Sequence, residues 1–324
     1  MQETRARILD ALTEGPVAGP ELAERLDVSR AAVWKHVEAL REEGFGIASS
    51  GEGYALVEFP EFGGATVEYD MDAPFDVEFH DSVPSTNARA RELAQEGGDD
   101  VVVLADEQTG GRGRLDREWT SPSGGIWLSI VVRPDVPPTH APAYTLAAAV
   151  AVTRVAREAG ADARIKWPND VVVSGASDSK SAPRSDDIER KLAGILTEME
   201  GEADRVSWVV VGVGINANVD PDELPSEANP ATLSTEVGYV NRRLFTQRVL
   251  EEFDALREDL ESVVPAWREY ATTLGKRVRV DTPGGEVVGE AVDVEFPGAL
   301  VVDTGDERVT VTAGDCEHLR PVER

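Results

Sequence analysis

Three arginines stand close together in a glycine-rich segment at residues 110–119, in a chain of 324 residues whose formal net charge is −29. Arg112, Arg114 and Arg117 carry guanidinium groups, which suit carboxylates and phosphates, and the neighbouring glycines let the backbone approach a ligand closely. A solvated basic turn is the alternative interpretation. Because the arginines oppose the composition of the rest of the chain, we predict a loop that binds an anion.

Two later motifs add further cations and a carboxylate. The segment KWPND at residues 166–170 supplies Lys166 and Asp170, and the segment RKLAGIL at residues 190–196 supplies Lys191. The Trp-Pro pair turns the chain tightly, which is expected to aim the Asn and Asp that follow it into one site. These motifs favour a cationic site over a lone basic turn.

The segments GRGRLDREW, KWPND, RKLAGIL and GVGIN, in this order, closely resemble the biotin protein ligases. Ser85-Thr86-Asn87 and Gln108 match positions at which the family contacts biotin. The resemblance covers about residues 80–322, and the N-terminal segment resembles the DNA-binding domain of the bifunctional, repressor-type members. It implies an α+β fold. This fold comprises a mixed α/β catalytic domain of the class II synthetase and biotin ligase type, an N-terminal winged helix and a C-terminal SH3-like β-barrel.

The activity that the resemblance implies is the ATP-dependent attachment of biotin to a protein lysine through an acyl-adenylate, biotinyl-5′-AMP. This step brings a carboxylate and a phosphate together, so the site needs fixed positive charges and strong hydrogen-bond donors. The expected cofactors are ATP and Mg²⁺, with the Mg²⁺ carried mainly on the phosphates, and biotin is the substrate. The sequence contains neither a Walker-type nor a Rossmann glycine motif, so the arginine segment and neighbouring strands are expected to bind the nucleotide.

The resemblance assigns roles to individual residues. Those expected to take part in catalysis are Arg112, Lys166, Asp170 and Lys191. Those expected to contact biotin are Ser85, Thr86, Asn87, Gln108, Arg112, Gly113, Arg114, Trp127, Lys191 and Gly194. Those expected to contact ATP or the adenylate are Arg114, Arg117, Trp119, Lys166, Asn169 and Asn216. No residue is expected to bind a metal ion directly.

Several of these roles compete with a structural interpretation. Lys191 is expected to contact the reacting carboxylate and phosphate, and the alternative is a surface lysine at a strand end. Asp170 is expected to act as a general base towards the acceptor amine, and the alternative is an Asx turn beside the proline. Trp119 and Trp127 are expected to wall the site, and the alternative for each is a place in the core.

The composition indicates the source and the cellular compartment to expect for the protein. The chain has 61 acidic and 32 basic residues and a pI near 4.4, with much more arginine than lysine. This balance is typical of halophilic proteins, since charge screening reaches only about 3 Å near 1 M salt, and it predicts a haloarchaeal source. The single cysteine, Cys316, and the lack of a signal peptide or of an apolar run of about 18 residues predict a cytoplasmic protein without a membrane partner.

Residues 1–60 are expected to form a winged helix-turn-helix domain, because two helical patterns precede a third that Ser29 caps, and a hairpin pattern follows. The residues expected to contact DNA are Ser29, Arg30, Trp34, Lys35 and His36. The domain carries six basic and eleven acidic side chains, a net charge of −5, so only a local positive stripe could bind phosphates. A protein-docking or vestigial domain is the alternative.

The rest of the chain is expected to comprise a linker at 61–76, a catalytic domain at 77–274 and a C-terminal domain at 275–324. The polar segment 174–187 is expected to be a flexible insertion between two strands. A helical pattern at 246–260 precedes the end of the catalytic domain.

The expected partners are a biotin carboxyl carrier domain, operator DNA and a second copy of the chain in a homodimer. Two other functions stay open. One is a non-catalytic, biotin-sensing regulator of transcription, against which the intact set of cations argues. The other is a lipoate or octanoyl ligase, a class that shares the fold but lacks the GRGRxxRxW motif.

Overall fold

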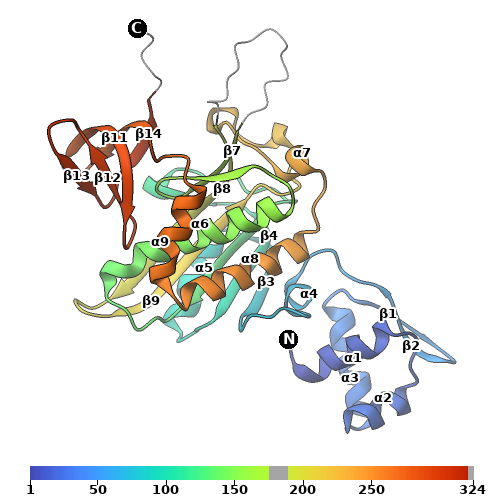
Figure 1. The fold of residues 1–324 in the computed structure, drawn as a ribbon. Coiled ribbons are helices and arrows are strands. Elements are labelled where there is room, and N and C mark those ends of the chain that lie inside the picture. The colour runs from blue at the N-terminus through green and yellow to red at the C-terminus, as the bar shows by residue number, and fades with distance from the viewer. Residues whose placement is uncertain (175–188, 320–324) are drawn as a thin grey trace.

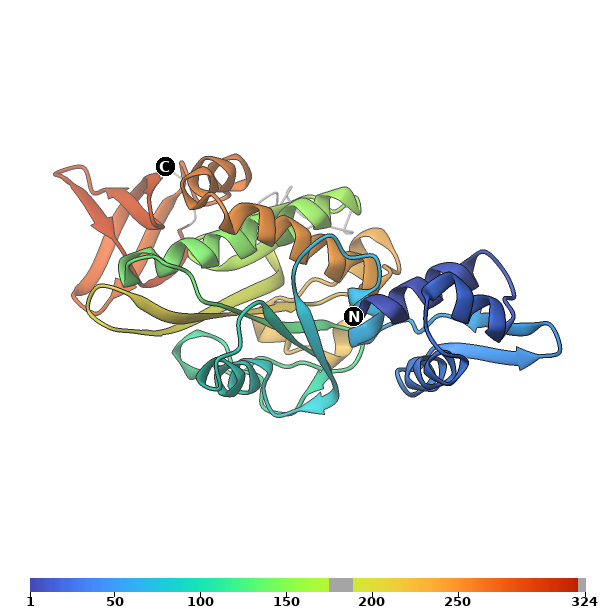
Figure 2. The same ribbon diagram turned by 90° about the horizontal axis from the view of Figure 1, so that it is seen from below.

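The computed structural model describes residues 1–174 and 189–319, which form three units in chain order (Figure 1). A winged-helix domain lies at one end, a seven-stranded sheet with its helices forms the middle, and a small antiparallel sheet lies at the other end (Figure 2). This arrangement confirms the predicted fold class. Most of the insertion predicted at 174–187 lies outside the described residues, and Ser174 itself is the last residue of a strand.

The N-terminal domain has the helices and the two-stranded wing of the predicted winged helix. Its elements are α1 (Glu3–Thr13), α2 (Gly19–Leu26), α3 (Arg30–Glu42), β1 (Gly46–Ser50) and β2 (Gly53–Glu58). Ile8, Leu22 and Val37, one from each helix, are fully buried in a common core. The Ser29 hydroxyl accepts a hydrogen bond from Ala32 N (3.1 Å), which caps α3 as predicted.

The segment predicted as a linker at 61–76 is instead a packed part of the domain junction. It contains α4 (Gly64–Glu68), in which Val67 is fully buried. Gln247 donates hydrogen bonds to the carbonyl oxygens of Val67 (2.8 Å) and Tyr69 (2.7 Å). A five-residue helix has too few apolar positions to show a period, so the sequence pattern did not predict it.

The middle unit is built on a mixed sheet with the strand order β3-β4-β5-β9-β8-β7-β6. Its strands are β3 (Asp76–Val83), β4 (Val101–Gln108), β5 (Ile126–Val132), β6 (Ala163–Lys166), β7 (Asp170–Ser174), β8 (Glu189–Gly201) and β9 (Val206–Ile215). Strands β3 and β4 run parallel, and the other neighbouring strands run antiparallel. Every residue of β5 is buried, because helices cover both faces of the sheet.

These helices are α5 (Thr86–Gln95), α6 (Ala141–Glu158), α7 (Leu233–Val237), α8 (Arg242–Arg257) and α9 (Leu260–Tyr270). Helix α6 packs on one face of the sheet and contacts α8 and α9, while α5 packs on the other face through Ala90 and Ala94 (Figure 2). The helix predicted at 246–260 begins earlier, because Asn241 accepts a hydrogen bond from Leu244 N and caps α8. No helix in the described ranges combines the length and apolar composition that a membrane span needs.

The C-terminal domain is an antiparallel sheet with the strand order β13-β12-β11-β10-β14, in agreement with the predicted SH3-like barrel. Its strands are β10 (Arg277–Thr282), β11 (Gly285–Glu295), β12 (Ala299–Asp303), β13 (Arg308–Val311) and β14 (Asp315–His318). Trp167 Nε1 donates to the carbonyl oxygen of Gly298 (2.9 Å), and Arg268 of α9 pairs with Asp293 (2.7 Å). These contacts fasten the domain to the catalytic domain.

A partly buried ionic cluster lies at the same junction. Glu189, at the start of β8, forms ion pairs with Lys276 Nζ (2.7 Å) and His318 Nδ1 (3.1 Å). Burial raises the pKa of Glu189, but hydrogen bonds from His318 and Lys276 outweigh burial and lower this pKa to about 2. Thr273 Oγ1 accepts a hydrogen bond from Trp167 N (2.9 Å) and lies 3.1 Å from His318 Nε2. The cluster therefore ties the C-terminal domain to β8 and to the KWPND motif.

Candidate active site

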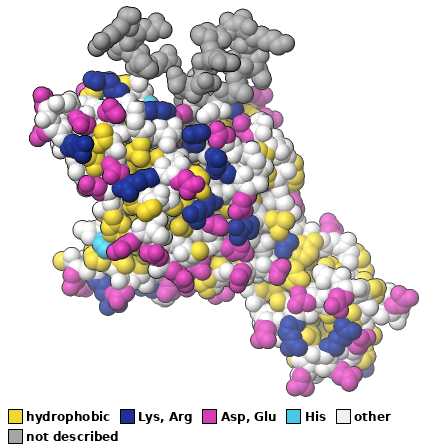
Figure 3. All heavy atoms as spheres, viewed as in Figure 1, with side chains coloured by type: hydrophobic (Ala, Val, Ile, Leu, Met, Phe, Trp, Pro, Cys, Tyr) yellow, Lys and Arg dark blue, Asp and Glu magenta, His cyan; other side chains and the backbone are white. Residues whose placement is uncertain are grey.

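A cavity of about 460 Å³ is lined by residues of β8, β9, the start of α5 and the loop between β4 and β5. We call residues 109–125 of this connection the arginine loop. A volume of this size is typical of sites that enclose a small molecule. Asp315 of the C-terminal domain also lines the cavity and pairs with Arg117, so two domains contribute to it. On the face drawn in Figure 3, Lys and Arg side chains gather over the catalytic domain among many acidic ones.

One end of the cavity is lined by neutral polar side chains. Thr86 donates through its backbone N–H (2.8 Å) and its hydroxyl (3.1 Å) to Gln108 Oε1. Gln108 Nε2 in turn donates to Ser121 Oγ (2.9 Å), which fixes the orientation of the amide. Ser85, whose hydroxyl caps α5, lies in the same group. Paired donors and acceptors without net charge suit a neutral ring such as a cyclic urea.

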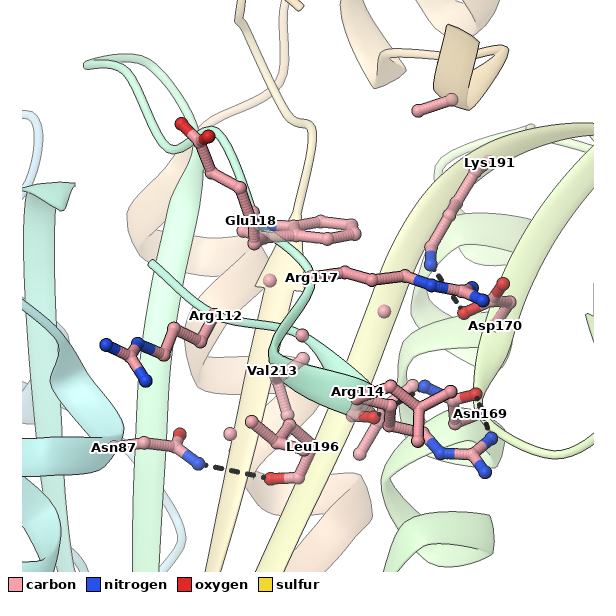
Figure 4. A pocket seen from close by; sticks show the side chains of 18 of the residues that line it. Asn87, Arg112, Arg114, Arg117, Glu118, Asn169, Asp170, Lys191, Leu196 and Val213 are labelled. Atoms are coloured by element: carbon pink, nitrogen blue, oxygen red, sulfur yellow. Dashed lines mark hydrogen bonds and ion pairs between the residues drawn. The ribbon is translucent and has the colours of Figure 1, made fainter. Parts of the chain in front are cut away.

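Asn87 belongs to the same end and is held from several sides. Its Oδ1 accepts from Ser129 Oγ (2.6 Å), and its Nδ2 donates to Glu198 Oε2 (2.8 Å) and to Leu196 O (3.3 Å; Figure 4). Ser129 is fully buried and also lies 2.8 Å from Thr86 Oγ1. Ser129 and Glu198 are absent from the sequence prediction. For Ser129 a signal exists, since a lone hydroxyl in an apolar strand needs a buried partner.

The other end of the cavity carries charged side chains from three motifs (Figure 4). Lys191 Nζ forms an ion pair with Asp170 Oδ1 at 2.7 Å. Arg114 donates to Asn169 Oδ1 (3.1 Å) and to the carbonyl oxygen of Gly314 (2.8 Å). Burial lowers the pKa of the Arg114 guanidinium, while nearby carboxylates oppose this effect. The KWPND and RKLAGIL motifs therefore meet the arginine loop at one place, which we call the cationic end.

Trp119 packs against β8 and β9 beside the cationic end. A Cβ atom at Gly214 would lie 2.6 Å from Trp119 Nε1, and one at Gly194 would lie 3.0 Å from the indole ring. Glycine at these paired positions therefore allows the indole to approach both strands. Lys191 Nζ lies 4.9 Å from the ring centroid. Among the residues described, Trp119 Nε1 is buried without a hydrogen-bond partner, which leaves a donor for a ligand.

The arginine loop extends past both ends of the cavity. Arg114 and Arg117 lie at the cationic end, whereas Arg112 lies on the side of Asn87 (Figure 4). The Arg112 side chain is 70% exposed and pairs with Asp116 of the same loop at 3.3 Å. Arg112 is therefore the most exposed of the three side chains and stands nearest to the polar end.

The cavity lining includes most of the predicted ligand contacts and omits three. Those that line it are Ser85, Thr86, Asn87, Gln108, Arg112, Gly113, Arg114, Arg117, Trp119, Asn169, Asp170, Lys191 and Gly194. Trp127 is instead fully buried behind Trp119, and its Nε1 donates to Pro122 O (2.9 Å). Asn216 is also buried, and its amide donates to the carbonyl oxygen of Lys191 (3.3 Å). The side chains of both residues are turned into the core and lie outside the cavity lining, and their ligand contacts stay predictions.

Lys166 is the third predicted residue outside the lining. Burial raises the pKa of the Cys316 thiol to about 12, although the charge of Lys166 opposes this shift. Lys166, the last residue of β6, pairs in register with Asp170 of the cavity lining but is not itself among the lining residues, so its catalytic role stays a prediction. Lining residues that were not predicted are Leu115, Glu118, Leu128, Ile195, Leu196, Gly212, Val213, Gly214, Pro225, Glu227, Ala228 and Asp315.

The predicted DNA contacts differ in exposure. Arg30, Trp34 and Lys35 are exposed on α3, with Trp34 58% exposed. His36 is only partly exposed, and burial lowers its pKa, as do the charges of Arg5 and Lys35. This side of α3 lies near α1, and the contact of His36 with DNA stays a prediction. An exposed aromatic flanked by two cations stays available for a partner.

Five of the six basic residues of the winged helix fall into two groups, and the sixth, Arg7, donates to the carbonyl oxygen of Arg25 (3.2 Å). Arg5, Arg25 and Arg41 form ion pairs with glutamates of the same domain. Within residues 1–174 and 189–319, Arg30 and Lys35 form no ion pair. The unpaired positive charges of α3 therefore lie on the exposed face that carries Trp34.

Three segments of the chain match known protein families. Residues 4–55 match the HTH domain, residues 79–216 match the Biotin/lipoate A/B protein ligase family, and residues 273–319 match the Biotin protein ligase C terminal domain. These matches coincide with the three structural units.

Individual relatives extend the likeness to most of the chain. The bifunctional ligase/repressor BirA of Bacillus subtilis is 34% identical over 320 residues, which cover 93% of each chain. The biotin–[acetyl-CoA-carboxylase] ligase of Mycobacterium tuberculosis is 36% identical over 249 residues, covering 73% of this chain and 86% of the relative. The biotin protein ligase from Aquifex aeolicus, solved in complex with biotin and ATP, is 23% identical and has the same fold. Its TM-score is 0.59, and the match covers 76% of this chain and 99% of that chain. The chain therefore belongs to the biotin protein ligase family, in the form that carries an N-terminal helix-turn-helix domain.

Proposed function

We propose that the protein is an ATP-dependent biotin–[biotin carboxyl carrier protein] ligase (EC 6.3.4.15). In the first step a biotin carboxylate oxygen attacks the α-phosphorus of ATP, the bond to the bridging oxygen breaks, and pyrophosphate leaves. In the second step the amine of an acceptor lysine attacks the acyl carbon of biotinyl-5′-AMP, and AMP leaves. The observation that carries this proposal is one cavity with a neutral hydrogen-bonding end and a cationic end.

The first step uses both ends of the cavity. At the neutral end Thr86, Asn87 and Gln108 bind the ureido ring through groups that are already oriented by one another. The valeryl chain then extends along β8, and the carboxylate meets Lys191 and Arg114. These two cations reduce the repulsion between the carboxylate and the phosphate, which is the main electrostatic obstacle to adenylation.

The second step uses the carboxylate of the same ion pair. Asp170, 2.7 Å from Lys191 Nζ, accepts a proton from the acceptor amine as this attacks. The neighbouring Lys191 stabilises the charge on the leaving phosphate. Trp119 and the arginine loop cover the adenylate, which keeps water from hydrolysing a reactive mixed anhydride.

Mg²⁺ enters this proposal with the nucleotide. Among the residues that the structure describes, no group of three or more His, Cys, Asp or Glu side chains could hold a metal ion. The phosphates of ATP and water would therefore supply most of the ligands of the ion, and its chemistry is to neutralise phosphate charge.

The test is the biotin-dependent exchange of labelled pyrophosphate into ATP, followed by transfer of labelled biotin to a carrier domain. We expect exchange with biotin, none with lipoate, and a requirement for Mg²⁺. Biotin binding without any exchange would identify a non-catalytic sensor, and exchange with lipoate would identify a lipoate ligase. Either result overturns the proposal.

A second function, biotin-responsive repression of transcription, is favoured by the exposed face of α3. Arg30 and Lys35 form no ion pair there and flank Trp34. These two cations supply the local positive stripe that an acidic domain needs to bind phosphates. Helix-turn-helix dimers contact half-sites about 34–36 Å apart. We therefore propose that a homodimer binds a palindromic operator when the adenylate is present.

Footprinting on the DNA upstream of biotin genes tests this second function. The expected result is protection of two half-sites in the presence of biotin and ATP, together with a dimeric mass by light scattering. Absence of any footprint, with ligase activity intact, would leave a ligase without a repressor role.

A further inference from the structure

Arg242, the first residue of α8, is a buried arginine that contacts three separate segments of the chain. It is 7% exposed, although it carries a full charge and lies outside the cavity lining. Its Nη1 donates to Asp106 Oδ1 (2.6 Å) and to the carbonyl oxygen of Gly125 (3.2 Å), and its Nε donates to Glu61 Oε1 (3.3 Å). A buried guanidinium with these partners is held firmly, because breaking any contact leaves a desolvated charge.

Two of these contacts lie at the two ends of the arginine loop. Asp106 stands two residues before the end of β4, and Gly125 is the last residue before β5. Asp106 also accepts from Ser123 Oγ (2.6 Å), so the returning part of the loop is joined to the same point. One side chain therefore fixes both ends of the segment that carries all three cavity arginines. Fixing the ends lowers the entropy that ordering of the loop over a ligand must overcome.

The third contact joins this point to the N-terminal domain. Glu61 lies directly before Phe62, whose ring centroid is 4.3 Å from the Arg242 guanidinium carbon. Both residues belong to the segment that leads through α4, which packs beside the start of α8 (Figure 1). The base of the arginine loop and the junction with the winged helix therefore share one guanidinium group.

We infer that Arg242 is a positioning residue for the ligase reaction, which holds the arginine loop at its base and links it to the winged-helix junction through Glu61. Its effect on activity rests on the proposed ligase function, but its effect on the loop does not. Arg243, the next residue, is a matched control. It donates to the carbonyl oxygens of Thr66 (2.8 Å) and Tyr69 (3.0 Å), which belong to the junction and not to the loop.

The experiment compares Arg242→Gln, Arg242→Lys and Arg243→Gln in the full chain. The first readout is the rate of tryptic cleavage after Arg112, Arg114 and Arg117, followed by mass spectrometry. We expect cleavage about tenfold faster in Arg242→Gln, an intermediate rate in Arg242→Lys, and the unmodified rate in Arg243→Gln. A tenfold change corresponds to about 1.4 kcal/mol, within the range of one hydrogen bond to a charged group.

The second readout is the KM for biotin in pyrophosphate exchange. This KM should rise about tenfold in Arg242→Gln while kcat changes less than threefold, because a less ordered loop weakens biotin binding more than it slows the chemical step. If Arg242→Gln does not fold, Asp106→Asn removes the negative charge that pairs with Arg242 at the base of the loop, keeps the contact with Gly125 O, and should raise both values about threefold. Cleavage at the unmodified rate in Arg242→Gln and Asp106→Asn, or equal acceleration in Arg243→Gln, would overturn the inference. Absence of exchange in the unmodified protein would count against the ligase function, and the cleavage rates would still decide the role of Arg242.

Discussion

The positive charges of the winged helix and those of the cavity differ in how they are paired with carboxylates. In the winged helix, ion pairs within the domain neutralise Arg5 and Arg41 and leave Arg30 and Lys35 exposed on α3. In the cavity, Lys191 pairs with a carboxylate from a neighbouring strand, and the arginine loop pairs with the C-terminal domain. One region therefore presents unpaired charge to solvent, and the other holds charge in pairs formed between motifs.

This difference shows how a chain with a net charge of −29 can bind anions in two places. Exposed, unpaired cations bind a polyanion by releasing counterions, which makes binding sensitive to salt. Cations in a partly enclosed cavity are screened less and are already oriented.

Substitution of Lys191 in the cavity should have the largest effect on activity. Lys191→Gln keeps a polar side chain but removes the charge that meets the carboxylate and phosphate, so kcat/KM for pyrophosphate exchange should fall about 10³-fold. Lys35→Gln on the winged helix is the matched control and should leave exchange unchanged. A fall of less than tenfold in Lys191→Gln would show that the cationic end does not carry the chemistry.

The ionic cluster around Glu189 should make the free energy of unfolding depend on pH in the acidic range. The pKa of Glu189 in the folded protein, about 2, lies below the ordinary value of 4.5, so ionised Glu189 stabilises the fold at pH values above 4.5. This contribution, about 3 kcal/mol, should be lost as the pH falls from 4.5 towards 2. Denaturant unfolding of the unmodified protein and of Glu189→Gln at a series of pH values measures it. A gap between the two that stays constant with pH contradicts the assignment.

Substitution of Asp170, the carboxylate of the cavity ion pair, should affect biotin transfer more than adenylation. Asp170→Asn keeps the shape of the side chain but cannot accept a proton, so transfer of biotin from the adenylate to the carrier lysine should slow about 10²-fold. Pyrophosphate exchange should fall much less. Single-turnover transfer from preformed biotinyl-5′-AMP measures the second step alone, and equal losses in both steps would remove the general-base role.

Substitutions in the winged helix should have the smallest effect, and this effect, on operator binding, should depend most on salt. Arg30→Gln removes an unpaired cation and should weaken operator binding about tenfold and lower the salt slope by about 1. Arg25→Gln removes an arginine that is already paired with Glu21, and it should change neither value. Fluorescence anisotropy at several salt concentrations measures both variants. If they behave alike, pairing within the domain does not decide which cations bind DNA.

Much of the cavity could be predicted because its charges stand in short motifs. Gln108 and Lys191 were expected at the ligand and do line the cavity, since residue type and local spacing carry that information. Trp119 and Trp127 could not be told apart, because strand pairing decides which indole reaches the cavity and which packs behind it. Lys166 belongs to a motif of the same kind and pairs in register with Asp170, but it is not among the lining residues.

Residues that act through distant contacts could not be predicted. Arg242 and Asp106 are 136 positions apart, and their contact exists only once α8 lies against the sheet. The fold shows the same limit. Long periodic patterns predicted the winged helix and the main strands, whereas α4 is too short to show a period and owes its place to contacts from Gln247.

Separate KM values for biotin and ATP in pyrophosphate exchange test most directly whether the cavity binds the two ligands end to end. Gln108→Ala alters the neutral end and should raise the KM for biotin about tenfold or more while the KM for ATP changes little. Arg114→Gln alters the cationic end and should raise the KM for ATP more than that for biotin. If both substitutions affect the same substrate, or neither affects exchange, the cavity does not bind the two ligands end to end.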